Sequence, residues 1–463
     1  SLHGQVIMGT KVYPPEQIKK LISRHDITEI ILAIPYVKSR ERRIVIKELE
    51  KFHLEVLVLP DYSDFATGRI NLRDLREIDV VDLLNRDSVE PKLELLSRSI
   101  MGKSILITGA GGSIGAELVR QVLRQNPERL VLLDISEFAL YQIEMEVLET
   151  MSAWPKSKRR PEVYGILGSV LDRNLINEVI RTHTIKTIYH AAAYKHVPIV
   201  EANIISGLEN NSFGMKVIAE AASQYAVDLV LLISTDKAVR PTNVMGASKR
   251  LAELILQSLH SEQSQTKFAI VRFGNVLDSS GSVVARFRKQ ISSGGPVTVT
   301  HKEITRYFMS IPEAAALVIQ AGAMAQGGDV FLLDMGEPIR INDLARQMIR
   351  LSGLEVRDEN NPDGDVEIVY TGLRPGEKLY EELLITPNAV GTEHPRILKS
   401  QEPFIERNEL EKELDLLKGA LSIRDKRAIQ KCLMRLVEDY LPEPISQDDT
   451  KKESAVDGSS MIH

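Results

Sequence analysis

The chain has 463 residues, 43% of them hydrophobic, and a formal net charge of −6 at pH 7. This length exceeds one ordinary domain, so two or three units with buried cores are expected. The balanced charge lacks the strongly basic face of most nucleic-acid binders, so no nucleic-acid partner is expected. The single cysteine, Cys432, cannot form an internal disulfide and favours a reducing, cytoplasmic setting.

No apolar run reaches the ~18 residues of a membrane span. The chain starts without a methionine and carries no signal peptide. We therefore expect a soluble fragment of a longer protein.

Residues 1–88 are predicted to form a small α/β domain, and residues 89–102 a charged linker. Apolar runs that suit strands alternate with helical spacing, which is typical of a parallel sheet. No glycine fingerprint or acid–base cluster occurs here, so we assign this domain no chemistry. The predicted strands are 5–8, 29–34 and 54–59, and the predicted helices are 14–22 and 40–52.

The main domain is predicted over 103–400, with a cofactor-binding part at about 103–273 and a smaller substrate lobe from about 274. Buried strands alternate with helical stretches, which predicts a doubly wound parallel sheet of the Rossmann type. Residues 401–441 show two amphipathic helices, and the polar tail at 442–463 is predicted to be disordered. The predicted strands of the main domain are 104–108, 130–134, 187–190, 230–234 and 269–273.

A glycine-rich loop joins the first strand of this domain to its first helix. Glycines at this place allow a tight turn and a close approach of the backbone to a pyrophosphate, which the helix N-terminus stabilises. An acid, Asp134, follows the next strand at the distance where a carboxylate reaches the adenosine ribose, which favours NAD over NADP. The alternative is that Asp134 only caps a turn. The predicted loop residues are Gly109, Gly112, Ser113, Ile114 and Gly115.

Five separated motifs occur in order along the chain. Together they resemble the extended short-chain dehydrogenase/reductase family, and within it the polysaccharide-biosynthesis branch that contains the UDP-N-acetylglucosamine 4,6-dehydratases. The resemblance covers roughly residues 70–400. The motifs are the glycine loop at 108–115, the segments 190–198 and 234–249, Arg272–Leu277 and Arg374–Lys378.

The resemblance implies NAD as cofactor and UDP-N-acetylglucosamine as substrate. Oxidation at C4, loss of water across C5–C6 and return of the hydride to C6 would give UDP-4-keto-6-deoxy-N-acetylglucosamine for bacterial surface glycans. The sequence leaves retention or inversion at C5 open, and the methionine in place of the usual tyrosine together with the extra N-terminal domain favours retention. Large members of the branch carry N-terminal transmembrane helices. The resemblance thus implies a full-length protein at the cytoplasmic face of the inner membrane, and association into homo-oligomers.

In relatives a Tyr-x-x-x-Lys pair serves the oxidation. Lys249 matches the lysine, but Met245 stands at the tyrosine position, and a thioether carries no such proton. We predict that Asp236 protonates the departing C6 hydroxyl and that Lys237 is the base at C5, with its pKa lowered by burial and nearby positive charge. Thr235 would orient or relay the C4 hydroxyl proton. The alternatives are a degenerate site or a surface ion pair.

Other positions carry over from the resemblance. A structural asparagine of the family matches Asn211. The cofactor is expected to contact Ser169, Val170, Ala191, Ala192 and Ala193. Lys195, Asn275, Arg306, Arg374 and Glu377 are the expected substrate contacts, since arginine forks match phosphate oxygens. No cysteine–histidine cluster suggests a metal.

Two other functions remain open from the sequence. A UDP-sugar 4-epimerase would share cofactor and substrate, but it keeps the tyrosine and needs no base at C5. A non-catalytic NAD or UDP-sugar sensor would explain Met245, but not the retained Thr235-Asp236-Lys237 group.

Overall fold

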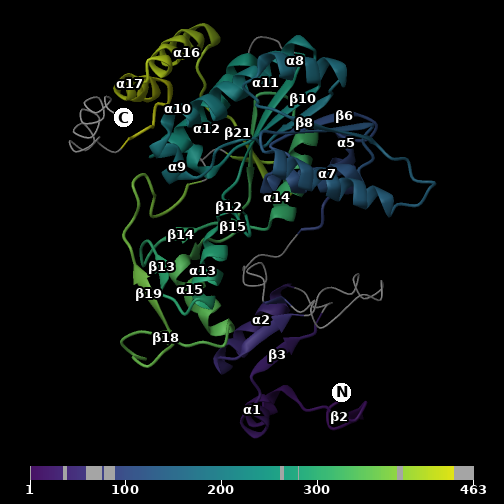
Figure 1. The fold of residues 1–463 in the computed structure, drawn as a ribbon, viewed down its shortest axis with the longest axis vertical. Helices are drawn as coiled ribbons and strands as arrows, with labels where there is room; N and C mark the ends of the chain where they lie inside the picture. Colours follow the sequence, from purple (N-terminus) through teal and green to yellow (C-terminus); the bar gives the residue numbers. More distant parts are fainter. Residues whose placement is uncertain are drawn as a thin grey trace, which may run out of the picture. The chain divides into compact units, whose positions relative to one another are not determined.

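The computed structural model describes most of the chain in two compact units, which Figure 1 colours along the sequence. One unit is drawn from Ser1–Glu90, Gly274–Ala314 and Met335–Leu373, and the other from Pro91–Phe273, Ala315–Asp334 and Arg374–His463. The structure describes residues 2–34, 39–58, 76–77, 89–260, 265–279, 281–382 and 389–442. Of the predicted tail at 442–463, all but the first residue lies outside these ranges.

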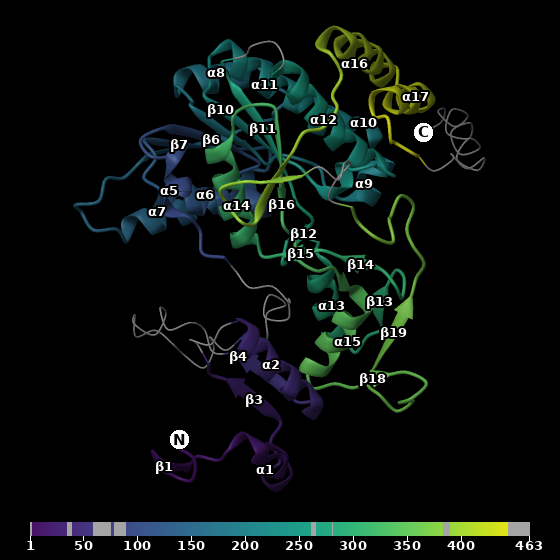
Figure 2. The same cartoon turned by 180° about the vertical axis from the view of Figure 1, so that it is seen from behind.

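The second unit is built on a nine-stranded sheet in the order β20-β21-β16-β11-β10-β9-β6-β7-β8. Figure 2 labels β6, β7, β10, β11 and β16 of this sheet. The pairs from β16 to β8 are all parallel, whereas β21 and β20 run antiparallel at one edge. The strands are β6 (Ser104–Thr108), β7 (Arg129–Asp134), β8 (Glu162–Leu167), β9 (Thr187–His190), β10 (Leu229–Ile233), β11 (Lys267–Arg272), β16 (Asp329–Leu333), β20 (Val390–Gly391) and β21 (Ile397–Ser400).

The helices of this unit cover the parallel sheet, as the alternation of strand and helix predicts. They are α5 (Leu93–Arg98), α6 (Ser113–Arg124), α7 (Glu137–Ser152), α8 (Arg173–Thr182), α9 (Val197–Ala202), α10 (Ile204–Leu208), α11 (Gly214–Gln224), α12 (Val244–His260), α14 (Ile311–Met324), α16 (Arg407–Ser422) and α17 (Lys426–Leu436). A π-helix at Glu209–Phe213 precedes α11, and the 3-10 turn η5 (Asp236–Ala238) follows β10.

Strand register brings three strand ends together. Thr108 of β6 pairs with His190 of β9, and His190 pairs with Leu232 of β10. Because the three strands are parallel, the loops after them leave the same edge of the sheet. The strand order also reverses direction on either side of β6, which is where doubly wound sheets bind their ligands.

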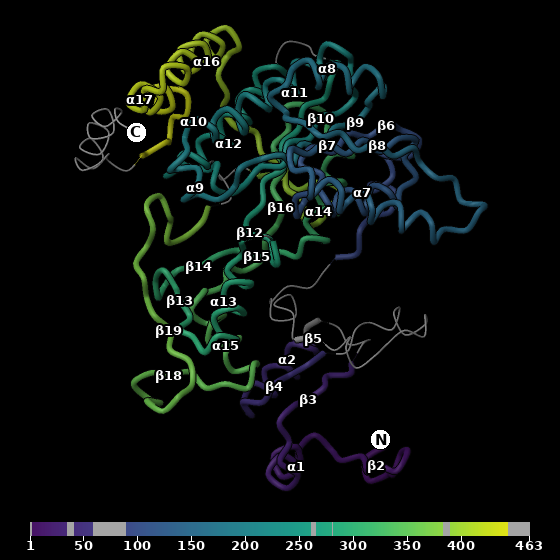
Figure 3. Tube along the Cα trace, viewed as in Figure 1, coloured from purple at the N-terminus to yellow at the C-terminus, as the bar shows by residue number. Residues whose placement is uncertain are grey.

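The C-terminal helices share the core of this unit. Leucines of α16 and residues of α17 are buried in one cluster with α11 and α12, and Figure 3 shows α16 beside α12. The apolar stripe predicted for this region therefore does pack inside the protein. Its residues are Leu410, Leu414, Leu417 and Leu421.

The first unit contains a small sheet in the order β3-β4-β5, with β3 and β4 parallel as predicted. Leu32, Ile46 and Val56 form its core together with Leu351. Its elements are β1 (Val6–Ile7), β2 (Thr10–Lys11), η1 (Pro15–Gln17), α1 (Ile18–His25), β3 (Glu29–Leu32), α2 (Ser39–Leu49), η2 (Glu50–Phe52), β4 (Glu55–Val58), β5 (Arg76–Glu77), β12 (Asn275–Val276), α13 (Val283–Ser292), β13 (Val297–Val299), β14 (Thr305–Arg306), β15 (Phe308–Met309), β17 (Ile339–Arg340), α15 (Ile341–Leu351), β18 (Val356–Arg357) and β19 (Val366–Tyr370).

The fold agrees with the predicted α/β class and Rossmann-type parallel sheet. Within the described ranges, no helix has the length and apolar character needed to cross a bilayer.

Candidate active site

The glycine loop is shaped for close packing. Gly109 has φ +66°, and a Cβ there would lie 2.7 Å from the Ala192 backbone. A Cβ on Gly115 would lie 1.9 Å from the carbonyl oxygen of Gly109, and one on Gly111 would lie 2.5 Å from Ala139 Cβ. Side chains at these positions would displace the backbone, so the loop keeps a turn that only glycines permit.

This loop fits a dinucleotide. Gly112 precedes α6 and makes no side-chain cap, and a helix N-terminus of this kind is a place where a pyrophosphate can bind. Asp134 ends β7 and accepts hydrogen bonds of 2.9 Å from the backbone of Gly111 and Ser136. Its carboxylate thus lies beside the glycine loop, as a group that binds the adenosine ribose must.

The segment after β9 is anchored to the same edge. Asn211 accepts a 2.8 Å hydrogen bond from the backbone N–H of Tyr194 and donates to the Tyr194 carbonyl and to Ser248 Oγ, both at 3.0 Å. These bonds tie the half-buried alanines 191–193 to α12. Asn211 thus has a positioning function in this structure.

His190 is fully buried at the end of β9. Its Nδ1 lies 2.8 Å from Thr108 Oγ1. Burial, with a contribution from Lys249, lowers the pKa of His190 to about 3. The ring is therefore neutral at physiological pH and joins two strand ends below the glycine loop.

The turn after β10 brings together three of the predicted catalytic side chains. Thr235 Oγ1 donates to Asp236 Oδ1 at 2.8 Å, and Lys237 Nζ donates to the same oxygen at 3.0 Å. The Asp236 side chain is fully buried and that of Lys237 is one quarter exposed. A charged pair in so buried a place is unlike the surface ion pair of the alternative interpretation.

A further carboxylate, which the sequence analysis did not identify, lies at this turn. Glu381 Oε1 is 2.6 Å from Lys237 Nζ, and its side chain is only 4% exposed. Its segment is held by hydrogen bonds from Thr242 and Asn243 to the Gly376 carbonyl and from Lys378 to the Val239 carbonyl. The signal in the sequence was the motif at 374–378, which begins only a few residues earlier.

The expectation that the pKa of Lys237 is lowered is wrong for this arrangement. Burial alone would lower it, but the charges of Asp236 and Glu381 outweigh burial and raise the pKa above its usual value. Burial alone would likewise raise the pKa of Asp236, but the Lys237 charge and the hydrogen bonds from Thr235 and Lys237 lower it. In this structure Asp236 is the anion and Lys237 the cation of an ion pair.

Helix α12 carries the two residues of the altered Tyr-x-x-x-Lys pattern. Met245 and Lys249 are four residues apart, and both are almost fully buried. Met245 packs in the main hydrophobic core. We call residues 235–237 the catalytic turn, after their predicted role. Helix α12 approaches this turn so closely that a Cβ on Gly246 would lie 2.1 Å from the Lys237 carbonyl oxygen. Met245 therefore contributes to packing in this structure.

We expect Lys249→Met to raise the free energy of unfolding of the cofactor-free protein near pH 7. Burial, opposed by the Glu253 charge, lowers the pKa of Lys249 from 10.5 to about 8. Below pH 8 the lysine is charged in both states, and holding the charge in the folded protein costs about 3 kcal/mol, since a difference of one in pKa corresponds to about 1.4 kcal/mol.

The pH dependence of stability tests whether the buried charge of Lys249 destabilises the folded protein. Between pH 8 and 10.5 the unfolded chain binds more protons at this lysine than the folded protein does. The stability of the wild type should rise with pH in this window, and Lys249→Met should lack that rise. Denaturant titrations at both ends of the window measure it. A Met variant less stable than the wild type near pH 7 would contradict the expectation.

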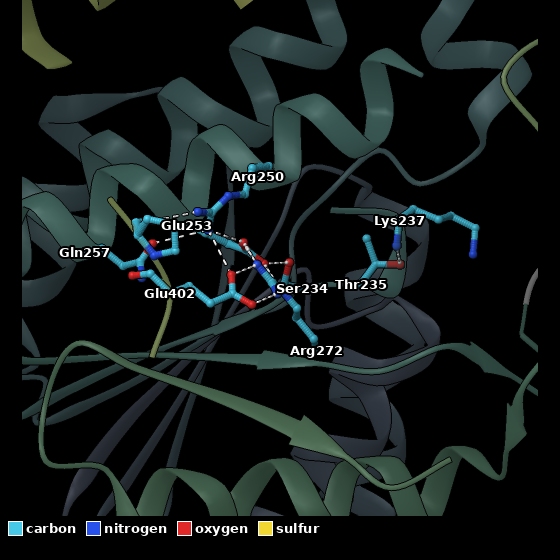
Figure 4. Close-up of polar contacts among 9 residues, drawn as sticks. Ser234, Thr235, Lys237, Arg250, Glu253, Gln257, Arg272 and Glu402 are labelled. Atoms are coloured by element: carbon cyan, nitrogen blue, oxygen red, sulfur yellow. Dashed lines mark hydrogen bonds and ion pairs between the residues drawn. The ribbon is translucent and has the colours of Figure 1, made fainter. Parts of the chain in front are cut away.

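A buried network of charges lies beside the turn of Thr235 and Lys237 (Figure 4). Arg272 of β11 is fully buried and binds Glu253 and Glu402 with two hydrogen bonds each, at 2.5–2.8 Å. Arg250 joins both carboxylates at 3.1 and 3.4 Å. Glu253 also accepts a 2.6 Å hydrogen bond from Ser234, directly before Thr235. The network thus connects β11, α12 and the segment at 402 to the catalytic turn.

The remaining predicted contacts are distributed over the two units. Ser169 accepts a 3.2 Å bond from the Leu171 backbone, and Val170 is buried in the core. Glu377 accepts a 3.1 Å bond from the backbone N–H of Arg374. Lys195 is exposed after β9, whereas half-buried Asn275 and Arg306 belong to the other unit. Within the described ranges no group of three or more His, Cys, Asp or Glu residues forms a metal site.

Residues 105–402 match the family model of the polysaccharide biosynthesis protein. The chain belongs to the polysaccharide biosynthesis protein family. This confirms the resemblance to the polysaccharide-biosynthesis branch of the extended short-chain dehydrogenase/reductases.

Two curated members of this family are similar to the chain over most of its length. The capsular polysaccharide biosynthesis protein CapD of Staphylococcus aureus is 46% identical over 369 residues, which are 80% of this chain and 59% of CapD. The probable polysaccharide biosynthesis protein EpsC of Bacillus subtilis is 42% identical over 383 residues, 82% of this chain and 62% of EpsC. The chain thus spans about three fifths of the length of these relatives.

A solved structure of similar fold is that of Pen from Bacillus thuringiensis. It is 30% identical, with a TM-score of 0.57, and the similarity covers 67% of this chain and 92% of Pen. The part of the chain that the family model matches contains the glycine loop, the catalytic turn and the buried network.

Proposed function

We propose that the chain catalyses the NAD-dependent 4,6-dehydration of UDP-N-acetylglucosamine to UDP-4-keto-6-deoxy-N-acetylglucosamine, with C5 retained, for surface polysaccharide synthesis. The observation that carries the proposal is the buried group of Asp236 and Lys237 at the same sheet edge as the glycine loop. A dehydration across C5–C6 needs an acid for the C6 oxygen and a base for the C5 proton, and this turn holds one candidate for each.

The cofactor would be held by residues that fit it. The glycine loop and the start of α6 suit the pyrophosphate, Asp134 the adenosine ribose, and buried Lys249 the nicotinamide ribose. Bound NAD+ would accept hydride from the sugar and return it. The name of CapD, a capsular polysaccharide biosynthesis protein, supports a place in surface glycan synthesis.

Before the reaction, the proposed acid Asp236 is an anion and the proposed base Lys237 is a cation. Asp236 and Lys237 lie 3.0 Å apart. Exclusion of water by a bound substrate disfavours charged groups, so loss of the Lys237 proton to a neighbouring carboxylate becomes easier. Asp236 in its protonated form would donate to the C6 oxygen, and neutral Lys237 would accept the C5 proton. Thr235, bonded to Asp236 at 2.8 Å, can pass the C4 hydroxyl proton to it.

The substrate lobe would supply phosphate contacts. Arg306 and Asn275 lie in the first unit, and Arg374 and Glu377 in the second. We propose Arg374 as a partner of the UDP phosphates, since guanidinium groups match phosphate oxygens, and Glu377 as the partner of the uridine ribose. Arg306 and Asn275 stay predictions from the resemblance. Lys195 would contact the sugar nucleotide from the segment after β9.

The test is incubation of the protein with UDP-N-acetylglucosamine in deuterated water, followed by NMR and mass spectrometry. We expect loss of one water, a new C6 methyl signal and deuterium at C5, and the C5 coupling should report retention. Unchanged mass with inversion at C4 would show a 4-epimerase. Binding of cofactor and substrate without any conversion would indicate a sensor and would end the proposal.

A further inference from the structure

Three ionisable side chains from two segments meet at the catalytic turn. Lys237 Nζ lies 3.0 Å from Asp236 Oδ1 and 2.6 Å from Glu381 Oε1. The side chain of Asp236 is fully buried and that of Glu381 is 4% exposed. Two carboxyl groups therefore contact one ammonium group where water has little access.

Lys237 needs a proton acceptor before it can act as a base. An ammonium group beside two carboxylates is stabilised as a cation, and a cation takes no proton from C5 of a sugar. Asp236 serves the C4 hydroxyl and the C6 oxygen in the proposed function, so it is not available for this purpose as well. Glu381 is the second carboxyl group in contact with the ammonium, and the proposed function gives it no other task.

We propose that Glu381 accepts the proton of Lys237 during the dehydration, which leaves the neutral amine as the base for the C5 proton. This inference rests on the proposed function. One proton moves from Nζ to the Glu381 carboxylate, and the Nζ lone pair then takes the C5 proton while Asp236 protonates the leaving C6 oxygen. Lys237 later returns a proton to C5, and Glu381 returns its own to Nζ, so no proton is gained or lost.

The contacts of Glu381 suit a group that holds a proton for part of the reaction. Its Oε1 lies 2.6 Å from Lys237 Nζ, close enough for a direct proton transfer, and its side chain is only 4% exposed. Glu381 acts through Lys237, so it is a positioning residue.

The neighbouring charges are largely paired with one another. On the segment of Glu381, Lys378 and Glu382 lie 3.4 Å apart, and Glu382 pairs with Arg240 at 2.6 Å. Helix α12, which packs against the turn, contributes buried Lys249, while its Glu253 is bound by Arg272. The neighbouring charge that lowers the pKa of Asp236 is that of Lys237.

The test compares the full chain with Glu381→Gln, Glu381→Asp and the matched control Glu382→Gln. Rapid mixing with NAD+ and UDP-N-acetylglucosamine follows cofactor reduction by absorbance, and mass spectrometry follows loss of water. For Glu381→Gln we expect cofactor reduction close to the wild-type rate and loss of water slowed by roughly 10²-fold, the size of a general acid–base contribution. Loss of water should recover as pH rises and Lys237 deprotonates by itself.

Glu381→Asp keeps an ionisable group and should fall between the wild type and Glu381→Gln, and Glu382→Gln should behave as the wild type. Wild-type loss of water in Glu381→Gln would overturn the inference and leave the proposed function standing. So would a joint fall of both steps with a pH profile of unchanged shape, in Glu381→Gln or, if that variant does not fold, in Glu381→Asp. A wild type that releases no water would end the proposed function itself.

A measurement without substrate tests the inference about Glu381 independently of the proposed function. Acylation of Lys237 by acetic anhydride, mapped by mass spectrometry against pH, reports how readily the amine deprotonates. Removal of the Glu381 charge should move acylation to lower pH in Glu381→Gln and not in Glu382→Gln. An unchanged acylation profile would show that Glu381 does not control the Lys237 proton.

Discussion

Arg272→Met is expected to lower the free energy of unfolding by about 3–5 kcal/mol, because it leaves buried carboxylates without their main counter-charge. Arg272, Glu253 and Glu402 all have fully buried side chains, and the guanidinium binds both carboxylates with two hydrogen bonds each. Arg250 remains, but it contacts the same two carboxylates at longer distances. Denaturant titration of both proteins at neutral pH measures the loss.

The pH dependence of that variant should be opposite to that of the wild type. Burial alone would raise the pKa of Glu253, but Arg272, Arg250 and Ser234 lower it to about 2. In the wild type this carboxylate therefore contributes stability above pH 4.5, which is lost as the pH falls towards 2. Without Arg272 burial dominates and raises the pKa of the carboxyl, so the folded protein binds the proton more tightly and the variant should gain stability on acidification.

A matched control distinguishes this network from ordinary ion pairs. Arg173→Met removes an arginine that contacts Glu220 at 2.6 Å but is 55% exposed. Its expected cost is about 0–1 kcal/mol, the range of surface pairs. Addition of Glu402→Gln to Arg272→Met should restore part of the lost stability. Equal effects of Arg272→Met and Arg173→Met would disprove the assigned importance of the network.

Asp236→Asn and Lys237→Ala should each reduce dehydration by at least roughly 10³-fold, in the range of general acid–base contributions. Asparagine keeps the shape of Asp236 but supplies no acidic proton, and alanine removes the candidate base. Neither side chain is among the predicted cofactor contacts, so NAD+ binding measured by calorimetry should persist. Turnover is measured with UDP-N-acetylglucosamine by loss of water.

Arg240→Met is the control for loss of a charge near the turn. Its side chain is half exposed and pairs with Glu382. We expect it to keep most of the wild-type turnover. Near-normal turnover in Asp236→Asn or Lys237→Ala would refute the assigned acid–base roles.

The parts of the fold that were predictable from the sequence depend on local patterns. Strand β6 contains a short apolar run, and its observed bounds agree with the predicted ones at 104–108. The bounds of β9 also agree with the prediction at 187–190. The glycine loop and Asp134 follow from fixed spacing around two strands. Edge strands such as β20, with two exposed residues, have no comparable pattern and were not predicted.

The parts that were missed depend on contacts between distant residues. Arg272 and Glu402 are 130 residues apart, and nothing in the local sequence of either predicts their pairing. Glu381 likewise reaches Lys237 only because its segment folds back onto the turn after β10. The wrong expectation for the pKa of Lys237 has the same origin. It was based on nearby positive charges and did not include the contact with Glu381.

The position of Glu402 bears on how the protein can be divided into recombinant fragments. A fragment that stopped at residue 400 would keep every motif residue of the cofactor loop and catalytic turn. It would nevertheless lack one of the two carboxylates that neutralise Arg272, as well as the leucine face of α16. Chimeras between relatives should therefore be joined after α17, so that the catalytic part keeps both carboxylates that neutralise Arg272.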